Sequence, residues 1–128
     1  MAISVLAVVA DCRDSLSLAR WWADVLDRQM SERNPGEYEV SDPGRRDTPL
    51  YFMNVPEPKS GKNRLHIDIS TDAPLEEEVA RLVAVGATLF EMRQDPPTLP
   101  NPDTWAVMQD PEGNEFCVFN SDTVTGLI

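Results

Sequence analysis

The sequence predicts an α+β fold in which two similar halves, each of about 60 residues, repeat one order of elements. Three observations support this prediction. Each half opens on an apolar stretch typical of a strand, continues into a helical pattern and ends in further strands. A connector rich in Pro, Lys and Gly, residues 56–63, separates the halves. A turn followed by an alternating strand closes the second half.

The first half begins with an apolar stretch, residues 3–10, that predicts a buried strand with Ser4 as its polar residue. Asp14 and Ser15 then offer N-caps for a helix whose apolar residues recur at helical spacing up to Leu26. The polar segment that follows predicts two short strands, and a more apolar strand precedes the connector. These three strands are expected at residues 30–33, 37–41 and 50–55.

The second half begins with the most regular alternation in the chain, at residues 64–70. We expect its apolar residues, Leu65, Ile67 and Ile69, to pack on helices, while His66 and Asp68 face a cleft. A second helix is expected to be capped by Asp72, with Pro74 in its first turn, and to end at Gly86. Strands are expected at residues 87–92, 105–109 and 115–119, with a proline-rich loop at 94–103 and a loose tail after residue 120.

Length and composition indicate one globular domain. The chain has 128 residues, 41% of them hydrophobic, and no apolar run of about 18 residues that would predict a membrane span. The first ten residues lack the basic start of a signal peptide, so we expect a cytoplasmic protein with no membrane partner. Cys12 and Cys117 are far apart and show no metal or redox spacing, which favours free thiols.

The net charge of −11 is unevenly distributed along the chain. Residues 1–64 carry 9 basic and 10 acidic side chains, a net charge of −1, whereas residues 65–128 carry 2 and 12, a net charge of −10. Phosphate binding requires the opposite sign, so nucleic acid is not an expected partner. Simple solubility explains the acidic half, and a cationic ligand is the functional alternative.

The closing segment identifies a family resemblance. Asp110-Pro111-Glu112-Gly113-Asn114 forms the turn, and Glu115-Phe116-Cys117-Val118-Phe119 forms the strand. This pair, together with residues 8–11 and 63–69, resembles the glyoxalase/bleomycin-resistance/dioxygenase superfamily, also called the vicinal oxygen chelate proteins. Residues 55–66, which include the connector, resemble an uncharacterised actinobacterial glyoxalase-like subgroup. The resemblance implies two βαβββ modules, about 1–58 and 63–122 within a single domain, that form a curved mixed sheet with a concave cleft.

The resemblance also implies where a metal would bind in the metal-using members. Counted from the flanking motifs, the four ligand positions hold Ser4, Met53 or its neighbour Phe52, His66 and Cys117. Among these, His66 is a usual ligand for a divalent cation, and Cys117 gives a second donor. Asp68 and Glu115 leave a rearranged site open. We expect no metal and no other cofactor.

Several candidate residues have two interpretations each. His66, the single histidine, either lines the pocket without a chemical role or acts as a general acid or base tuned by Asp68. Cys117 as a nucleophile is the weaker idea, because the acidic half would raise its pKa. Trp105 either packs in the core or stacks on a flat ligand. The expected ligand-binding residues are Ser4, Leu6, Tyr51, Met53, His66, Asp68, Trp105, Glu115, Cys117 and Phe119.

These expectations lead to three functions in order of preference. The first is a metal-independent small-molecule-binding protein of the glyoxalase-like group, with lyase or isomerase chemistry at His66 as its catalytic form. The alternative is an antibiotic-sequestering protein of the bleomycin-resistance type, which traps a cationic drug without chemistry. A metal-dependent glyoxalase or dioxygenase comes last, because ligands are missing. The resemblance also implies a homodimer.

Overall fold

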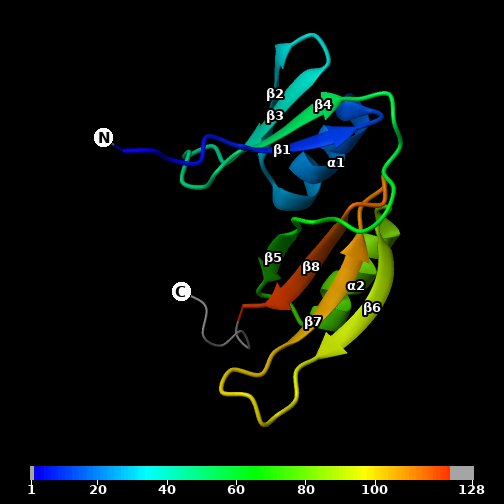
Figure 1. Cartoon of the computed structure of the whole chain (residues 1–128). Helices are drawn as coiled ribbons and strands as arrows, with labels where there is room; N and C mark the ends of the chain where they lie inside the picture. Colours follow the sequence, from blue (N-terminus) through cyan, green and yellow to red (C-terminus); the bar gives the residue numbers. More distant parts are fainter. Residues whose placement is uncertain (1, 122–128) are drawn as a thin grey trace. The chain divides into compact units, whose positions relative to one another are not determined.

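The computed structural model describes residues 2–121, and the chain divides into two compact units, residues 1–59 and 60–128 (Figure 1). Each unit is one βαβββ module, so the predicted α+β class with two repeated modules is confirmed. The division falls inside the predicted connector. No helix among residues 2–121 combines the length and apolar character that crossing a membrane requires.

The first unit is a four-stranded mixed sheet with one helix packed against it. Its elements are β1 Val8–Cys12, α1 Ser15–Leu26, β2 Gln29–Asn34, β3 Glu37–Ser41 and β4 Leu50–Asn54. The strand order is β1-β4-β3-β2; β1 and β4 are parallel, and the other neighbours are antiparallel. Asp14 is the N-cap of α1, as predicted, and its carboxylate accepts a hydrogen bond from the N–H of Ser17 at 3.1 Å.

The first strand is shorter than predicted, because it begins at Val8 and not at Ile3. β1 pairs with β4 alone, and this pairing starts with Val8 opposite Leu50. The chain just before Leu50 is a Pro- and Gly-rich turn, so it offers no strand to the residues before Val8. Ser4 and Leu6 therefore lie outside the strand and are exposed.

The second unit repeats the arrangement with its own sheet and helix. Its elements are β5 Ile67–Thr71, α2 Leu75–Ala84, β6 Thr88–Gln94, β7 Thr104–Gln109 and β8 Glu115–Asn120. The strand order is β5-β8-β7-β6, with β5 and β8 parallel and the other pairs antiparallel. α2 packs on β6, β7 and β8, so one face of this sheet is covered by the helix.

Two predictions at the start of the second unit are wrong. Asp72 does not cap α2: the N-cap position is Pro74, and no side chain caps the helix there. The Thr71 hydroxyl instead accepts the N–H of Ala73 at 3.1 Å, and the fixed φ of Pro74 starts the helix. Leu65 does not pack on a helix, because it precedes β5 and is 84% exposed.

The alternation predicted for β5 is confirmed within the strand itself. Ile67 and Ile69 lie opposite Phe116 and Val118 of β8, which are 1% and 0% exposed. These four residues share the buried face of the sheet, since directly opposed residues of neighbouring strands point to the same side. Asp68 therefore points to the other face, together with Cys117, its neighbour on β8.

A β-bulge in β6 changes which residues face that second side. Leu89 and Glu91 pair with consecutive residues of β7, so Phe90 is an extra residue with no partner. The bulge reverses the alternation after it, and Arg93 consequently lies opposite Trp105 on the uncovered face. An unbroken strand would have placed Arg93 on the same side as Leu89, toward the helix.

The turn between β7 and β8 has the structure that its sequence predicts. Asp110, 4% exposed, accepts hydrogen bonds from the backbone N–H groups of Glu112 at 2.9 Å and Asn114 at 3.0 Å. Gly113 has a φ of +86°, a conformation that side-chain-bearing residues adopt with strain. This turn fixes the register of β8 against β7, which decides the residues that β8 presents on each face.

Candidate functional site

The candidate site is a cavity of about 400 Å³ on the sheet of the second unit, within the size range usual for small-molecule sites. Its walls come from the sheet face that carries Cys117, opposite the face of Phe116 and Val118, and from the segment just before β5. Six of the ten predicted ligand-binding residues line it: His66, Asp68, Trp105, Glu115, Cys117 and Phe119.

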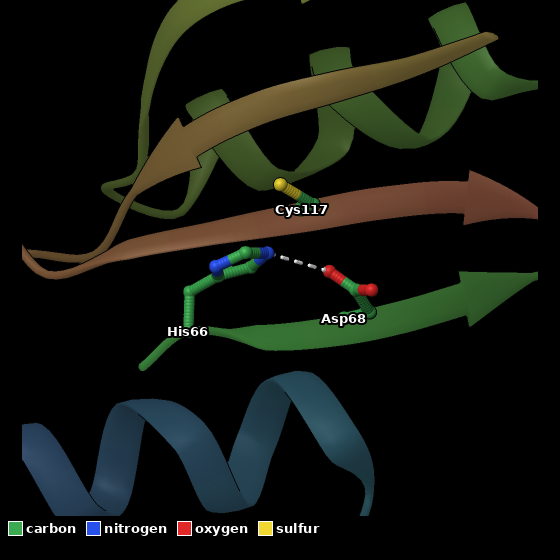
Figure 2. Close-up of side chains that lie close together, drawn as sticks. All are labelled: His66, Asp68 and Cys117. Atoms are coloured by element: carbon green, nitrogen blue, oxygen red, sulfur yellow. Dashed lines mark ion pairs between the residues drawn. The ribbon is translucent and has the colours of Figure 1, made fainter. Parts of the chain in front are cut away.

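His66, Asp68 and Cys117 form a cluster in this cavity (Figure 2). His66 immediately precedes β5 and Asp68 is two residues later, so both side chains lie on one side of the chain. The His66 Nε2 and the Asp68 Oδ1 are 3.1 Å apart. Cys117 is the direct neighbour of Asp68 on β8, and one nitrogen, oxygen or sulfur atom of each residue lies within 4.8 Å of the others.

The environment of Cys117 disfavours a reactive thiolate. The side chain is buried, and this burial is the main cause that raises the pKa of the thiol. The negative charge of Asp68 raises the same pKa further, while the charges of Lys62 and Arg93 lower it in part. A neutral thiol is a poor nucleophile, so the expectation that the acidic surroundings weaken Cys117 agrees with the geometry.

An aromatic wall forms the apolar part of the cavity. The Trp105 and Phe119 rings are stacked, with centroids 5.7 Å apart and planes at 19°, because the two residues are paired across β7 and β8. Phe90, at the bulge, also lines the cavity and is 62% exposed. Aromatic faces of this kind are suited to a flat ligand.

Three polar lining residues were not foreseen from the sequence: Lys62, Arg93 and Gln109. Arg93 reaches this face because of the bulge, and its Nε contacts Glu91 Oε2 at 2.6 Å. Lys62 belongs to the connector, to which the sequence assigned only the role of separating the two halves. The alternation of residues 105–109, continued from Trp105, was the signal that could have identified Gln109 and also Val107, a further apolar lining residue.

Glu115 is held at the edge of the cavity. The backbone N–H of Asn63 donates to Glu115 Oε2 at 3.3 Å, and the Asn63 side-chain amide donates to the Glu115 carbonyl at 3.4 Å. These bonds tie the connector to the first residue of β8. They give the Glu115 carboxylate a structural role beside its place in the cavity wall.

The other four predicted residues belong to the first unit and do not line this cavity. Ser4 and Leu6 precede β1, as described above. Tyr51 and Met53 lie on β4, and the Tyr51 hydroxyl donates to Glu37 Oε1 at 3.2 Å. Burial, followed by this contact with Glu37, raises the pKa of Tyr51, so the phenol stays neutral.

The side chains present do not fit the four-ligand metal site that the resemblance implies. Two of its positions hold Ser4, which lies outside β1, and Met53, and neither is a good ligand for Fe, Mn, Ni or Zn. Within residues 2–121, the cluster of His66, Asp68 and Cys117 offers three donors. These are three donors where the family site implied by the resemblance has four, and His66 and Asp68 already contact each other.

Comparison with known proteins decides the family. The model of the glyoxalase-like domain matches residues 7–119, which is most of the chain. The chain belongs to the glyoxalase-like domain family. No curated protein matches this sequence significantly.

Solved structures share the fold of this glyoxalase-like protein over almost its whole length. A glyoxalase/bleomycin resistance protein/dioxygenase family enzyme from Burkholderia phytofirmans has a TM-score of 0.70 at 22% identity, covering 92% of this chain and 98% of its own. A glyoxalase-related enzyme from Fulvimarina pelagi has a TM-score of 0.68 at 19% identity, with coverages of 94% and 90%. A fosfomycin resistance protein from Listeria monocytogenes has a TM-score of 0.71 at 12% identity, with coverages of 93% and 90%. At these identities the likeness shows a common fold, which hosts unrelated chemistries.

Proposed function

We propose that this glyoxalase-like protein binds a small molecule in the cavity of the second unit and that His66 transfers a proton there without a metal. The observation that carries the proposal is the contact of 3.1 Å between His66 Nε2 and Asp68 Oδ1 inside the cavity. Membership in the actinobacterial glyoxalase-like subgroup and assembly into a homodimer are part of the same proposal. Light scattering on purified protein tests the homodimer.

The geometry assigns a role to each member of the pair. Asp68 Oδ1 lies 3.1 Å from Nε2, so a proton on Nε2 would face the carboxylate and Nδ1 would be left as the proton acceptor. The resulting imidazolium is stabilised by the carboxylate beside it. Both side chains are accessible, with exposures of 42% and 49%, so a bound ligand can reach them.

This arrangement suits the removal and return of a proton at a carbon next to a carbonyl group, which is the first step of many lyase and isomerase reactions. The aromatic wall of Trp105 and Phe119 would hold the ligand beside the imidazole. Positioning of this kind is needed because a base acts only within hydrogen-bond reach of the proton.

Sequestration of a ligand without chemistry, as in the antibiotic-binding alternative, is the second candidate. The burial of Cys117 beside the Asp68 carboxylate favours it, because a thiol in that setting is a poor nucleophile and offers no covalent chemistry. For a cationic ligand, the carboxylates of Asp68 and Glu115 in the wall would supply the attraction.

Hydrogen–deuterium exchange separates these two functions. The probe is 2-tetralone, a flat aromatic ketone with acidic C–H bonds next to its carbonyl, followed by NMR in D₂O. We expect the wild type to accelerate exchange beyond an equal concentration of free imidazole, and His66→Gln to lose this acceleration while still binding 2-tetralone. Binding by the wild type with no accelerated exchange would contradict proton transfer and favour sequestration.

The matched control for the carboxylate uses two aspartates close in sequence. Asp68→Asn removes the partner of His66 and should slow exchange, whereas Asp72→Asn makes the same change of charge at an exposed residue outside the cavity. Equal effects of the two substitutions would show that net charge, and not the hydrogen bond to the imidazole, controls the rate.

A further inference from the structure

We propose that the cavity of the second unit selects flat aromatic ligands that carry a carboxylate or a similar anion, although the protein as a whole is strongly acidic. The inference rests on the proposed function only in that it concerns the same cavity. It names the class of ligand and makes no use of the chemistry at His66.

Three charged residues of the cavity wall already have a partner beside them. Asp68 contacts His66 at 3.1 Å, and Glu115 accepts the N–H of Asn63 at 3.3 Å. Arg93 contacts Glu91 at 2.6 Å, although this pair is half exposed. The acidic members of the wall therefore have hydrogen-bond donors beside them.

Lys62 differs from these residues. It lines the cavity, and its ammonium group makes no ion pair or hydrogen bond with any residue between 2 and 121. Lys62 and Arg93 both line the cavity, and their charges lower the pKa of Cys117 in part. Arg93 is paired with Glu91 and the carboxylates of Asp68 and Glu115 each have a donor beside them, so Lys62 is the charged group of the wall left to pair with a ligand, and an anion would complement it.

The aromatic residues of the wall indicate the shape of the ligand. The Trp105 and Phe119 rings stack with centroids 5.7 Å apart and line the cavity, and Phe90 adds an exposed ring at the bulge. A fused aromatic ring fills such a space with favourable contact area. The same bulge places Arg93 beside Trp105, so the aromatic surface and a cation are neighbours on one sheet face.

The cations of the cavity wall, Lys62 and Arg93, have the opposite sign to the net charge of the protein. Asp68 and Glu115 are the acidic residues of the cavity wall, and the other described acidic residues of the second half lie outside it. Salt screens charges separated by more than about 10 Å at 0.1 M ionic strength. A cation in direct contact with a bound carboxylate is screened much less. The nearest charges therefore decide which ligand binds, and the net charge of −11 does not.

The test compares three naphthalene probes of one shape: 2-naphthoate, 2-naphthalenemethanol and 2-naphthylmethylammonium, measured by calorimetry in one buffer. We expect 2-naphthoate to bind at least about fivefold more tightly than the ammonium compound, which corresponds to roughly 1 kcal/mol. None of the three probes carries an acidic C–H next to a carbonyl, so failure of proton transfer at His66 would leave this result unchanged.

Matched variants assign the effect to the cavity. Lys62→Gln should weaken 2-naphthoate about fivefold and leave 2-naphthalenemethanol unchanged, and Arg93→Gln should act in the same direction. Lys59→Gln removes the same charge from the connector outside the cavity and should have little effect. Trp105→Ala should weaken all three probes, with Trp105→Phe retaining most of the affinity.

Three results would overturn the inference. The first is an affinity for 2-naphthylmethylammonium that equals or exceeds that for 2-naphthoate, which would instead support a trap for cations. The second is an equal effect of Lys62→Gln and Lys59→Gln. The third is the absence of measurable binding of any of the three probes to the folded wild type.

Discussion

Val118→Ala is the substitution that tests most directly which face of β8 is the core and which is the site. Val118 is 0% exposed and lies on the buried face, whereas its neighbour Cys117 lies on the cavity face. Val118→Ala removes two methyl groups. Moving each from water into the protein interior contributes about 0.8 kcal/mol to stability, and their removal leaves a small cavity behind. The expected loss in the free energy of unfolding is about 2–3 kcal/mol.

Cys117→Ala is the matched control on the same strand. It removes one sulfur atom that borders the cavity, so it should cost roughly 1 kcal/mol or less. Urea unfolding followed by circular dichroism measures both variants. With a dependence on urea of about 2 kcal/mol per molar, the midpoint should fall by about 1–1.5 M for Val118→Ala and by less than about 0.5 M for Cys117→Ala. A larger loss for Cys117→Ala than for Val118→Ala would show that the two faces of β8 are assigned the wrong way round.

Three further predictions concern the metal, the thiol and the closing turn. The first uses untagged protein that is purified without chelator and incubated with Ni²⁺, Mn²⁺, Fe²⁺ and Zn²⁺. It should retain well under one metal ion per chain, because the four-ligand set is incomplete. A tight one-to-one complex that is lost in His66→Ala would overturn this prediction. In a Cys12→Ala background, Cys117 should react with a disulfide reagent more slowly than free cysteine, and Asp68→Asn should speed the reaction, because burial and the Asp68 charge raise the pKa of the thiol. Since the folded pKa is the higher one, the stabilisation linked to this thiol is complete below its ordinary value of 9.0 and is lost as the pH rises toward the folded value. Asp110→Ala should lower the free energy of unfolding by about 1–3 kcal/mol, because two backbone N–H groups lose their carboxylate acceptor, and an unchanged urea midpoint would show that water replaces it.

The parts of the fold that depend on neighbouring residues were predictable from the sequence. The cap at Asp14 and the turn at Asp110 are each made by contacts within four residues. The alternation of β8 then follows from the turn, because a fixed register leaves one choice of faces. The stacking of Trp105 on Phe119 is a further consequence of that register, although the sequence alone favoured core packing for Trp105.

The parts that failed depend on a partner distant in sequence. Whether the residues before Val8 continue β1 is decided by where β4 begins, and nothing in the apolar pattern of residues 3–10 carries that information. The bulge at Phe90 likewise exists only in the pairing of β6 with β7. Because it reverses the alternation, sequence reasoning missed Arg93, a cation that lines the cavity.

The parallel pairing of β5 with β8 has a consequence for when the site comes into being. β5 opens the second unit and β8 closes it, so their contact joins the two ends of that unit's chain and is among its least local. Contacts of this kind form late, since the intervening chain must first be ordered. During synthesis, Asp68 leaves the ribosome well before Cys117, and until β8 follows, one side of β5 has no partner strand. The cavity is therefore completed by the last strand of residues 2–121, and a nascent chain that ends before Glu115 would lack the part of its wall formed by Glu115, Cys117 and Phe119.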